Sequence, residues 1–171
     1  AIVAVLGPMI APYDPNQMFY GDERLPPSTK YWFGTDNGGR DVFSWVVWGA
    51  RVSLYVGLAT VLIELLIGVT LGMIAGYFGG IIDEVLMRIT DVILTLPTFM
   101  LIILAVTMFE VRGANIMIMI MGVLGWPFLA RVVRSEFLSL KEATFVEAAR
   151  SMAASNWRIM LRHILPNLLS I

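Results

Sequence analysis

Long apolar runs separated by short polar segments dominate the pattern of this chain. Residues 52–78 form the first complete run, 27 residues whose only charged side chain is Glu64. Residues 92–109 carry no charge, and residues 114–130 form a third, shorter run that further apolar residues can extend. A helix needs about 20 apolar residues to cross the hydrocarbon core of a bilayer. The pattern therefore predicts three transmembrane helices within residues 45–134.

Different segments flank these runs. Residues 1–11 are apolar but too short to cross a membrane, which predicts the end of a transmembrane helix whose beginning is missing. Residues 12–44 are rich in Pro, Gly, Asp and Asn, which predicts an ordered loop outside the bilayer. Asp41 is placed to cap the helix that follows this loop. Residues 168–171 begin another apolar run and predict the start of the next transmembrane helix.

Residues 135–167 are too polar to cross a membrane and are predicted to form two short helices. In the first helix, small side chains and one carboxylate share one side, namely Ala143, Glu147, Ala148 and Ser151. Such a strip makes a shallow surface that another protein can cover closely. The second helix is predicted to follow the capping residues Ser155 and Asn156 and to end or kink at Pro166.

Composition and charge strengthen the membrane interpretation. The chain is 58% hydrophobic and 15% charged, and its net charge of −1 gives no indication of nucleic acid as a partner. It has no cysteine and a single histidine, so we expect neither a metal site nor a cofactor. Six cations follow the third run: Arg131, Arg134, Lys141, Arg150, Arg158 and Arg162. By the positive-inside rule they place residues 135–167 in the cytoplasm, together with the polar break at residues 79–91, and residues 12–44 outside.

The C-terminal segment resembles a known family. Its sequence "EAARSMAASNWRIMLRHILPN" is similar to the cytoplasmic EAA loop in the membrane subunits of binding-protein-dependent ABC importers. That loop contains Glu-Ala-Ala, a glycine after three further residues, and an Ile-x-Leu-Pro ending. The matching residues are Glu147, Ala148 and Ala149, with Ala153 where the family has glycine, and His163, Ile164, Leu165, Pro166 and Asn167 at the end. If the glycine position needs a left-handed backbone, alanine costs about 1 kcal/mol there.

A second stretch narrows the resemblance to one branch of the family. "YWFGTDNGGRDVFSWVVWGARVSLYVG" is similar to the extracytoplasmic signature of dipeptide, oligopeptide and nickel permeases. Among the residues that carry it are Trp32, Gly34, Asp36, Arg40 and Asp41. The stretches "GMIAGYFGGIIDEVLMRITDVILTLP" and "WPFLARVVRSEFLSLKEATFVEAAR" resemble the second subunit type of that branch.

The resemblance implies a fold, a location and a set of partners. The fold is an all-α polytopic transmembrane bundle of the type I ABC importer permease class, in a bacterial inner membrane. The function is to form part of the pathway of an ATP-driven importer for peptides, nickel or a related solute. Its partners are a second permease subunit, an extracytoplasmic substrate-binding protein and cytoplasmic ATP-binding subunits that hydrolyse the ATP, so the chain itself is not an enzyme. The implied ATPase-coupling residues are Glu147, Ala148, Ala149, Arg150, Ala153, Pro166 and Asn167.

Some charged residues leave alternatives open. Glu64 lies inside a span, where an unpaired charge is costly. It either faces a neighbouring helix or watered cavity with a hydrogen-bond partner, is protonated, or serves as a proton or cation site in an ion-coupled secondary transporter. The acidic break around Asp83, Glu84, Arg88 and Asp91 either pairs with the basic C-terminal segment or is solvated. Asp36, Arg40 and Asp41 either fix the turn of the outer loop or contact the substrate-binding protein.

Overall fold

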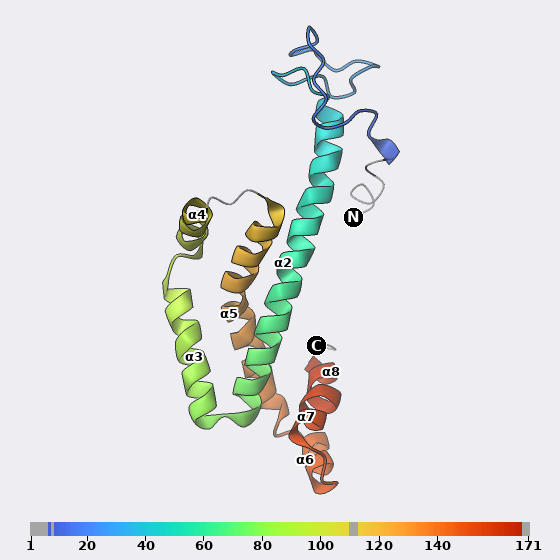
Figure 1. Cartoon of the computed structure of the whole chain (residues 1–171). Coiled ribbons are helices and arrows are strands. Elements are labelled where there is room, and N and C mark those ends of the chain that lie inside the picture. The colour runs from blue at the N-terminus through green and yellow to red at the C-terminus, as the bar shows by residue number, and fades with distance from the viewer. Residues whose placement is uncertain (1–6, 8, 110–112, 169–171) are drawn as a thin grey trace. The chain divides into compact units, whose positions relative to one another are not determined.

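The computed structural model describes residues 7, 9–109 and 113–168, and its described part is mostly helical (Figure 1). The chain divides into two compact units, residues 1–58 and residues 59–171. The predicted helix end at residues 1–11 lies largely outside the described residues. The start of a further span at residues 168–171 does so as well, except for Leu168.

In unit 1, an irregular loop of residues 12–41, here called the N-terminal loop, leads into helix α2 (Val42–Phe78). The carboxylate of Asp41 accepts hydrogen bonds from the Ser44 backbone N–H at 2.8 Å and from its hydroxyl at 2.6 Å. This confirms Asp41 as the N-terminal cap of α2, because its side chain satisfies a donor that has no partner within the helix.

Tyr31 lies in the interior of the N-terminal loop. Its side chain is only 1% exposed and packs against the rings of Tyr13 and Phe19 in the small core of that loop. The adjacent Trp32 and Phe33 are more than half exposed, and both rings rest on Phe43 in the first turn of α2. The loop therefore has an aromatic interior and a separate aromatic surface.

In unit 2, α2 is followed by α3 (Gly80–Thr95), α4 (Thr98–Met108) and α5 (Ala114–Leu140). Helices α3 and α5 lie side by side (Figure 1). By length and composition, α2 and α5 can each cross a membrane, and α3 with α4 makes a third candidate span if the bent pair is counted as one.

The second predicted span, residues 92–109, is not one straight helix. Its apolar residues are divided between α3 and α4, whose axes are bent by 79° at Leu96 and Pro97. Proline disfavours helical backbone at the residue before it and lacks the N–H that would continue the helix. The polar segment 79–91 is itself helical except at Gly79.

Three glycines on one face of α2 allow close packing against α5. A side chain at Gly72 would lie 2.5 Å from the Ala130 carbonyl, and one at Gly76 would lie 2.6 Å from Cβ of Phe137. Gly68 faces Leu129 in the same way. These glycines therefore form a helix-packing face of α2.

The C-terminal part of unit 2 consists of short helices: α6 (Thr144–Ser151), α7 (Asn156–Arg158), the π-helix η1 (Ile159–Ile164) and α8 (Leu165–Leu168). The chain stays helical through Pro166 instead of ending before it. Pro166 has no backbone N–H and cannot make the usual i to i−4 hydrogen bond. The wider π-helical turn of η1, just before it, is where the backbone adapts to this. Ser155 occupies the N-cap position of α7, but its side chain makes no capping hydrogen bond.

Candidate functional site

Helix α6 has a buried face and an exposed face. Glu147, Ala148, Arg150 and Ser151 are exposed, so small and charged side chains do share an accessible surface. Ala149 is only 1% exposed and points into the interior together with Val146. The inclusion of Ala149 in the predicted contact surface is therefore corrected: at 100° per residue, its side chain turns away from that of Glu147.

An apolar core holds the C-terminal helices on the ends of α2 and α5. Its buried members are Met73, Tyr77, Val133, Phe137, Val146, Ala149, Ile159, Met160 and Ile164. Phe137, Ile159 and Ile164 have no exposed surface at all. Because protein interiors are packed as densely as organic crystals, a displacement of α6 is resisted by all of these contacts at once.

Tyr77 adds a polar link across this core. Its hydroxyl donates a hydrogen bond to Oδ1 of Asn156 at 3.0 Å, although the two residues are 79 positions apart in sequence. The Arg150 guanidinium lies 5.7 Å from the centre of the Tyr77 ring. The last turn of α2 thus contacts α6 through Arg150 and α7 through Asn156. In the sequence, the only sign of this role of Tyr77 is a polar aromatic residue at the end of an apolar run.

Helix α6 ends with Ala153 in a left-handed conformation, φ 55°. The Ala153 N–H donates to the Arg150 carbonyl at 2.9 Å, and the Ala154 N–H donates to the Ala149 carbonyl at 3.2 Å. This pair of bonds is a Schellman motif, in which the left-handed residue is usually glycine. The conditional prediction that this position needs a left-handed backbone is confirmed, and the Cβ of Ala153 makes that conformation costly.

Pro166 and Asn167 are exposed at the end of the segment. The Asn167 side-chain amide donates to the His163 carbonyl at 2.6 Å, spanning the turn that contains Pro166. Both residues continue the helix, so the structure places them in its last described turns rather than in a sharp reversal.

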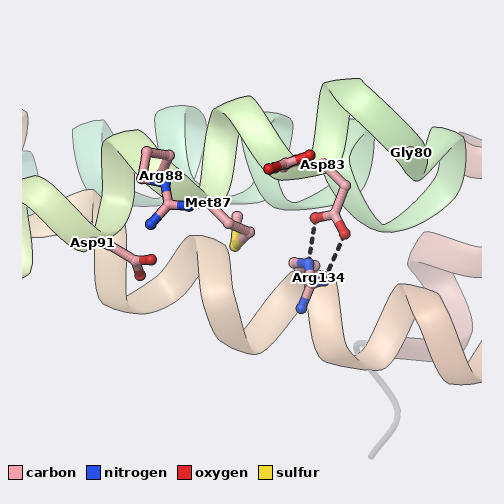
Figure 2. Close-up of a pocket in the computed structure, with 7 residues that line it drawn as sticks. Gly80, Asp83, Met87, Arg88, Asp91 and Arg134 are labelled. Atoms are coloured by element: carbon pink, nitrogen blue, oxygen red, sulfur yellow. Dashed lines mark hydrogen bonds and ion pairs between the residues drawn. The ribbon is translucent and has the colours of Figure 1, made fainter.

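Two ion pairs join α3 to α5 beside an open cavity of about 320 Å³, and Figure 2 shows the pair formed by Asp83 and Arg134. Arg134 donates two hydrogen bonds to the Asp83 carboxylate, which is only 15% exposed, and Arg131 pairs with Asp91. Glu84, Met87 and Arg88 complete the cavity wall. Asp83 and Asp91 therefore pair with cations of α5, and among the described residues neither pairs with a cation of residues 135–167.

Glu64 lies against α5, with its carboxylate over the Cα of Gly125. A side chain at position 125 would overlap this carboxylate, so glycine is what admits Glu64 to the helix contact. Glu64 therefore faces a neighbouring helix, as one of the alternatives expected. That alternative also expected a hydrogen-bond partner, and none is found for the Glu64 carboxylate among the residues that the structure describes.

The signature residues of the N-terminal loop stabilise its turns. The Asp36 carboxylate accepts the backbone N–H groups of Gly38 and Arg40 at 2.8 and 2.9 Å. These hydrogen bonds lower the pKa of Asp36 from its ordinary value, and the bond from the Arg40 N–H has the larger effect. Gly34 has φ 74°, and a Cβ there would lie 2.3 Å from the Leu25 carbonyl oxygen, so this position does not admit a side chain. The role of these residues in fixing the turn is confirmed.

A second charged group also belongs to the loop. Asp22 accepts hydrogen bonds from Lys30 at 2.9 Å and from the Tyr31 hydroxyl at 2.7 Å. The bond from Lys30, followed by that from Tyr31, lowers the pKa of Asp22. The same bond raises the pKa of Lys30. The loop is therefore held by ionised side chains as well as by aromatic packing.

Residues 68–171 match the protein family described as binding-protein-dependent transport system inner membrane component. The chain belongs to this family. The membership confirms the type I ABC permease fold that the EAA-like sequence implied, and it confirms the assignment to the inner membrane. The family comprises transport permeases rather than enzymes.

Individual relatives agree with the predicted branch. The chain is 40% identical to the dipeptide transport system permease protein DppC of Bacillus subtilis, with 97% of this chain and 52% of the relative covered. It is 40% identical to the glutathione transport system permease protein GsiD of Pectobacterium atrosepticum, with coverage of 98% and 56%. It is 38% identical to the oligopeptide transport system permease protein OppC of Bacillus subtilis, with coverage of 97% and 54%. The chain thus spans about half the length of these relatives.

Proposed function

We propose that this chain is part of the transmembrane subunit of an ATP-driven importer for peptides, and that α6 couples it to cytoplasmic ATP-binding subunits. The main supporting observation is the two-sided character of α6. Its exposed side carries Glu147, Ala148 and Arg150, while its other side is fixed in the apolar core at the ends of α2 and α5. A surface of this kind can accept a force from a partner and transmit it to both long helices.

The description of the family supports the proposed partners. Binding-protein-dependent transport requires a substrate-binding protein on the outer side, and the N-terminal loop is the part of this chain that faces it under the positive-inside orientation. A second permease subunit completes the pathway, and ATP hydrolysis resides in the ATP-binding subunits. The dipeptide, oligopeptide and glutathione systems of the relatives support small peptides as the substrate class.

An ion-coupled transporter that uses Glu64 is less well supported. Family membership favours ATP as the energy source. The position of Glu64 against Gly125 is also sufficiently explained by helix packing, since the glycine provides the space that the carboxylate occupies.

Reversing the charge of Glu147 tests the coupling role. In the full-length transporter, Glu147→Arg is expected to reduce ATP-dependent uptake of a radiolabelled dipeptide by about tenfold or more, because a reversed charge at an interface typically costs several kcal/mol. The ATP-binding subunits should also co-purify less with the variant, while the membrane subunits stay assembled.

Glu142→Arg is the matched control, since Glu142 is an exposed acid that precedes α6. It should retain both uptake and co-purification. The proposal fails if Glu147→Arg transports normally and still retains the ATP-binding subunits. Uptake that continues without ATP and follows a proton gradient would instead support the ion-coupled alternative.

A further inference from the structure

The end of α2 is joined to the C-terminal helices by side-chain contacts and not by the adjacent chain. Helix α5 leads into α6 through residues 141–143, so the backbone itself makes the end of α5 and α6 move together. In contrast, α3, α4 and α5 all separate α2 from α6 in sequence. A movement of α6 therefore reaches α2 directly only through side chains that cross between them, and Tyr77 is one of these.

Tyr77 makes two different contacts with two of the C-terminal helices. Its hydroxyl donates to Oδ1 of Asn156 in α7 at 3.0 Å. Its ring centre lies 5.7 Å from the Arg150 guanidinium of α6, a distance at which a cation is attracted to the face of an aromatic ring. Tyr77 itself is only 8% exposed, so the surrounding core holds its side chain in one position.

The contacts of Tyr77 are directional, whereas the apolar contacts around it are not. Met73 of α2 lies in the same core, but apolar contacts have no preferred direction and allow helices to slide. A hydrogen bond weakens steeply when its length or angle changes, so the bond to Asn156 fixes where α7 stands along α2.

Arg150 connects the outer surface of α6 to this buried ring. It is exposed on the same side of α6 as Glu147, the surface that is proposed to meet the ATP-binding subunits. Its guanidinium nevertheless contacts Tyr77. A partner that displaces Arg150 therefore acts on the end of α2 through one intervening side chain.

We propose that Tyr77 is the positioning residue that makes α2 follow α6 and α7, so that ATP hydrolysis in the partner subunits moves both long helices together. This inference rests on the proposed function, because it requires that α6 receives the ATP-binding subunits. Without the Tyr77 hydrogen bond, α5 still follows α6 through the chain, but α2 follows less completely. ATP hydrolysis then continues with less transport.

Uptake per ATP hydrolysed, measured in the full-length transporter with its binding protein and a radiolabelled dipeptide, tests this role. Tyr77→Phe removes the hydroxyl and keeps the ring, and it should lower this ratio about fivefold, since one hydrogen bond contributes about that factor to an equilibrium. Asn156→Ala removes the acceptor and should have the same effect. The double variant should show no further loss, because both changes remove the same bond.

Tyr20→Phe is the control, since it removes the hydroxyl of a tyrosine that is 87% exposed in the N-terminal loop and should leave the ratio unchanged. The ratio is measured in complexes that retain the ATP-binding subunits, so it is independent of how much complex assembles. If uptake and ATP hydrolysis fall together in Tyr77→Phe and Asn156→Ala, Tyr77 only stabilises the core and the inference is overturned.

This outcome is distinguishable from failure of the proposed function. If Glu147→Arg weakens the binding of the ATP-binding subunits while Tyr77→Phe keeps the ratio, the role of Tyr77 alone is refuted. If Glu147→Arg leaves both that binding and uptake intact, the proposed function is refuted, and the role of Tyr77 is refuted with it.

Discussion

The N-terminal loop and the C-terminal helices are both ordered segments next to long apolar helices, yet they are stabilised by different interactions. The loop depends on carboxylates, at Asp22, Asp36 and Asp41, that accept hydrogen bonds from backbone and side-chain donors. The C-terminal helices depend on an apolar core that includes Phe137, with the Tyr77 hydrogen bond as a polar addition. The loop should therefore respond to pH, and the C-terminal helices should respond to changes in packing volume.

The largest expected effect comes from emptying the core under α6. Phe137→Ala removes a fully buried ring and should destabilise the C-terminal helices by about 3 kcal/mol or more. Protease cleavage within residues 144–164 should then become faster in the purified transporter. Phe128→Ala is the control on the same helix, because Phe128 is 70% exposed. Equal sensitivity of the two variants would mean that the core does not hold the segment.

A smaller effect is expected from separating α2 and α5. The Cβ introduced by Gly76→Ala would lie 2.6 Å from Cβ of Phe137 and 2.8 Å from the Arg134 carbonyl. Overpacking of this kind typically costs about 1–3 kcal/mol, so thermal unfolding in detergent should occur at a lower temperature. Gly57→Ala, where the added Cβ meets no atom within 4 Å, should not lower it. An unchanged unfolding temperature in Gly76→Ala would contradict the close approach of α2 and α5.

Relieving strain at the end of α6 should stabilise the protein. Ala153→Gly removes the Cβ from a left-handed residue and is expected to gain about 1 kcal/mol, measured as a higher temperature of unfolding. Ala148→Gly, within α6, should instead lose about 1 kcal/mol, because glycine is a poor helix former. If Ala153→Gly also destabilised the protein, the left-handed end of α6 would be in doubt.

The smallest expected effect is the gradual response of the N-terminal loop to pH. Asp22 and Asp36 have lowered pKa values in the folded loop, so each stabilises it above the ordinary aspartate pKa of about 3.9. This stabilisation is lost as pH falls through the lower, folded values. Hydrogen exchange of residues 22–40 should therefore accelerate in acid, and the C-terminal helices should show less change. Asp22→Asn should weaken the pH dependence, and an unaltered profile would refute the role of Asp22.

Local patterns predicted much of the fold and part of the candidate site. The apolar runs located α2 and α5, and Asp41 was identified as a cap because that chemistry involves only its next neighbours. The motifs at Glu147–Ala149 and around Trp32 were sufficient to indicate the family, because each consists of residues close together in the sequence. Local patterns did not predict that Ala149 faces the core or that Asp83 pairs with Arg134 of α5. Both facts depend on which helices lie side by side.

The sequence by itself determined the apolar spans, the cap at Asp41 and the membership of a transport family. These features depend on the composition of a run, on backbone geometry or on motifs of adjacent residues. Only the tertiary structure decided that Tyr77 reaches Asn156, that Gly125 accommodates Glu64 and that Ala153 is left-handed. Such contacts join residues far apart in the chain or depend on backbone torsions, and a linear pattern encodes neither the approach of two helices nor the rotation of each about its own axis.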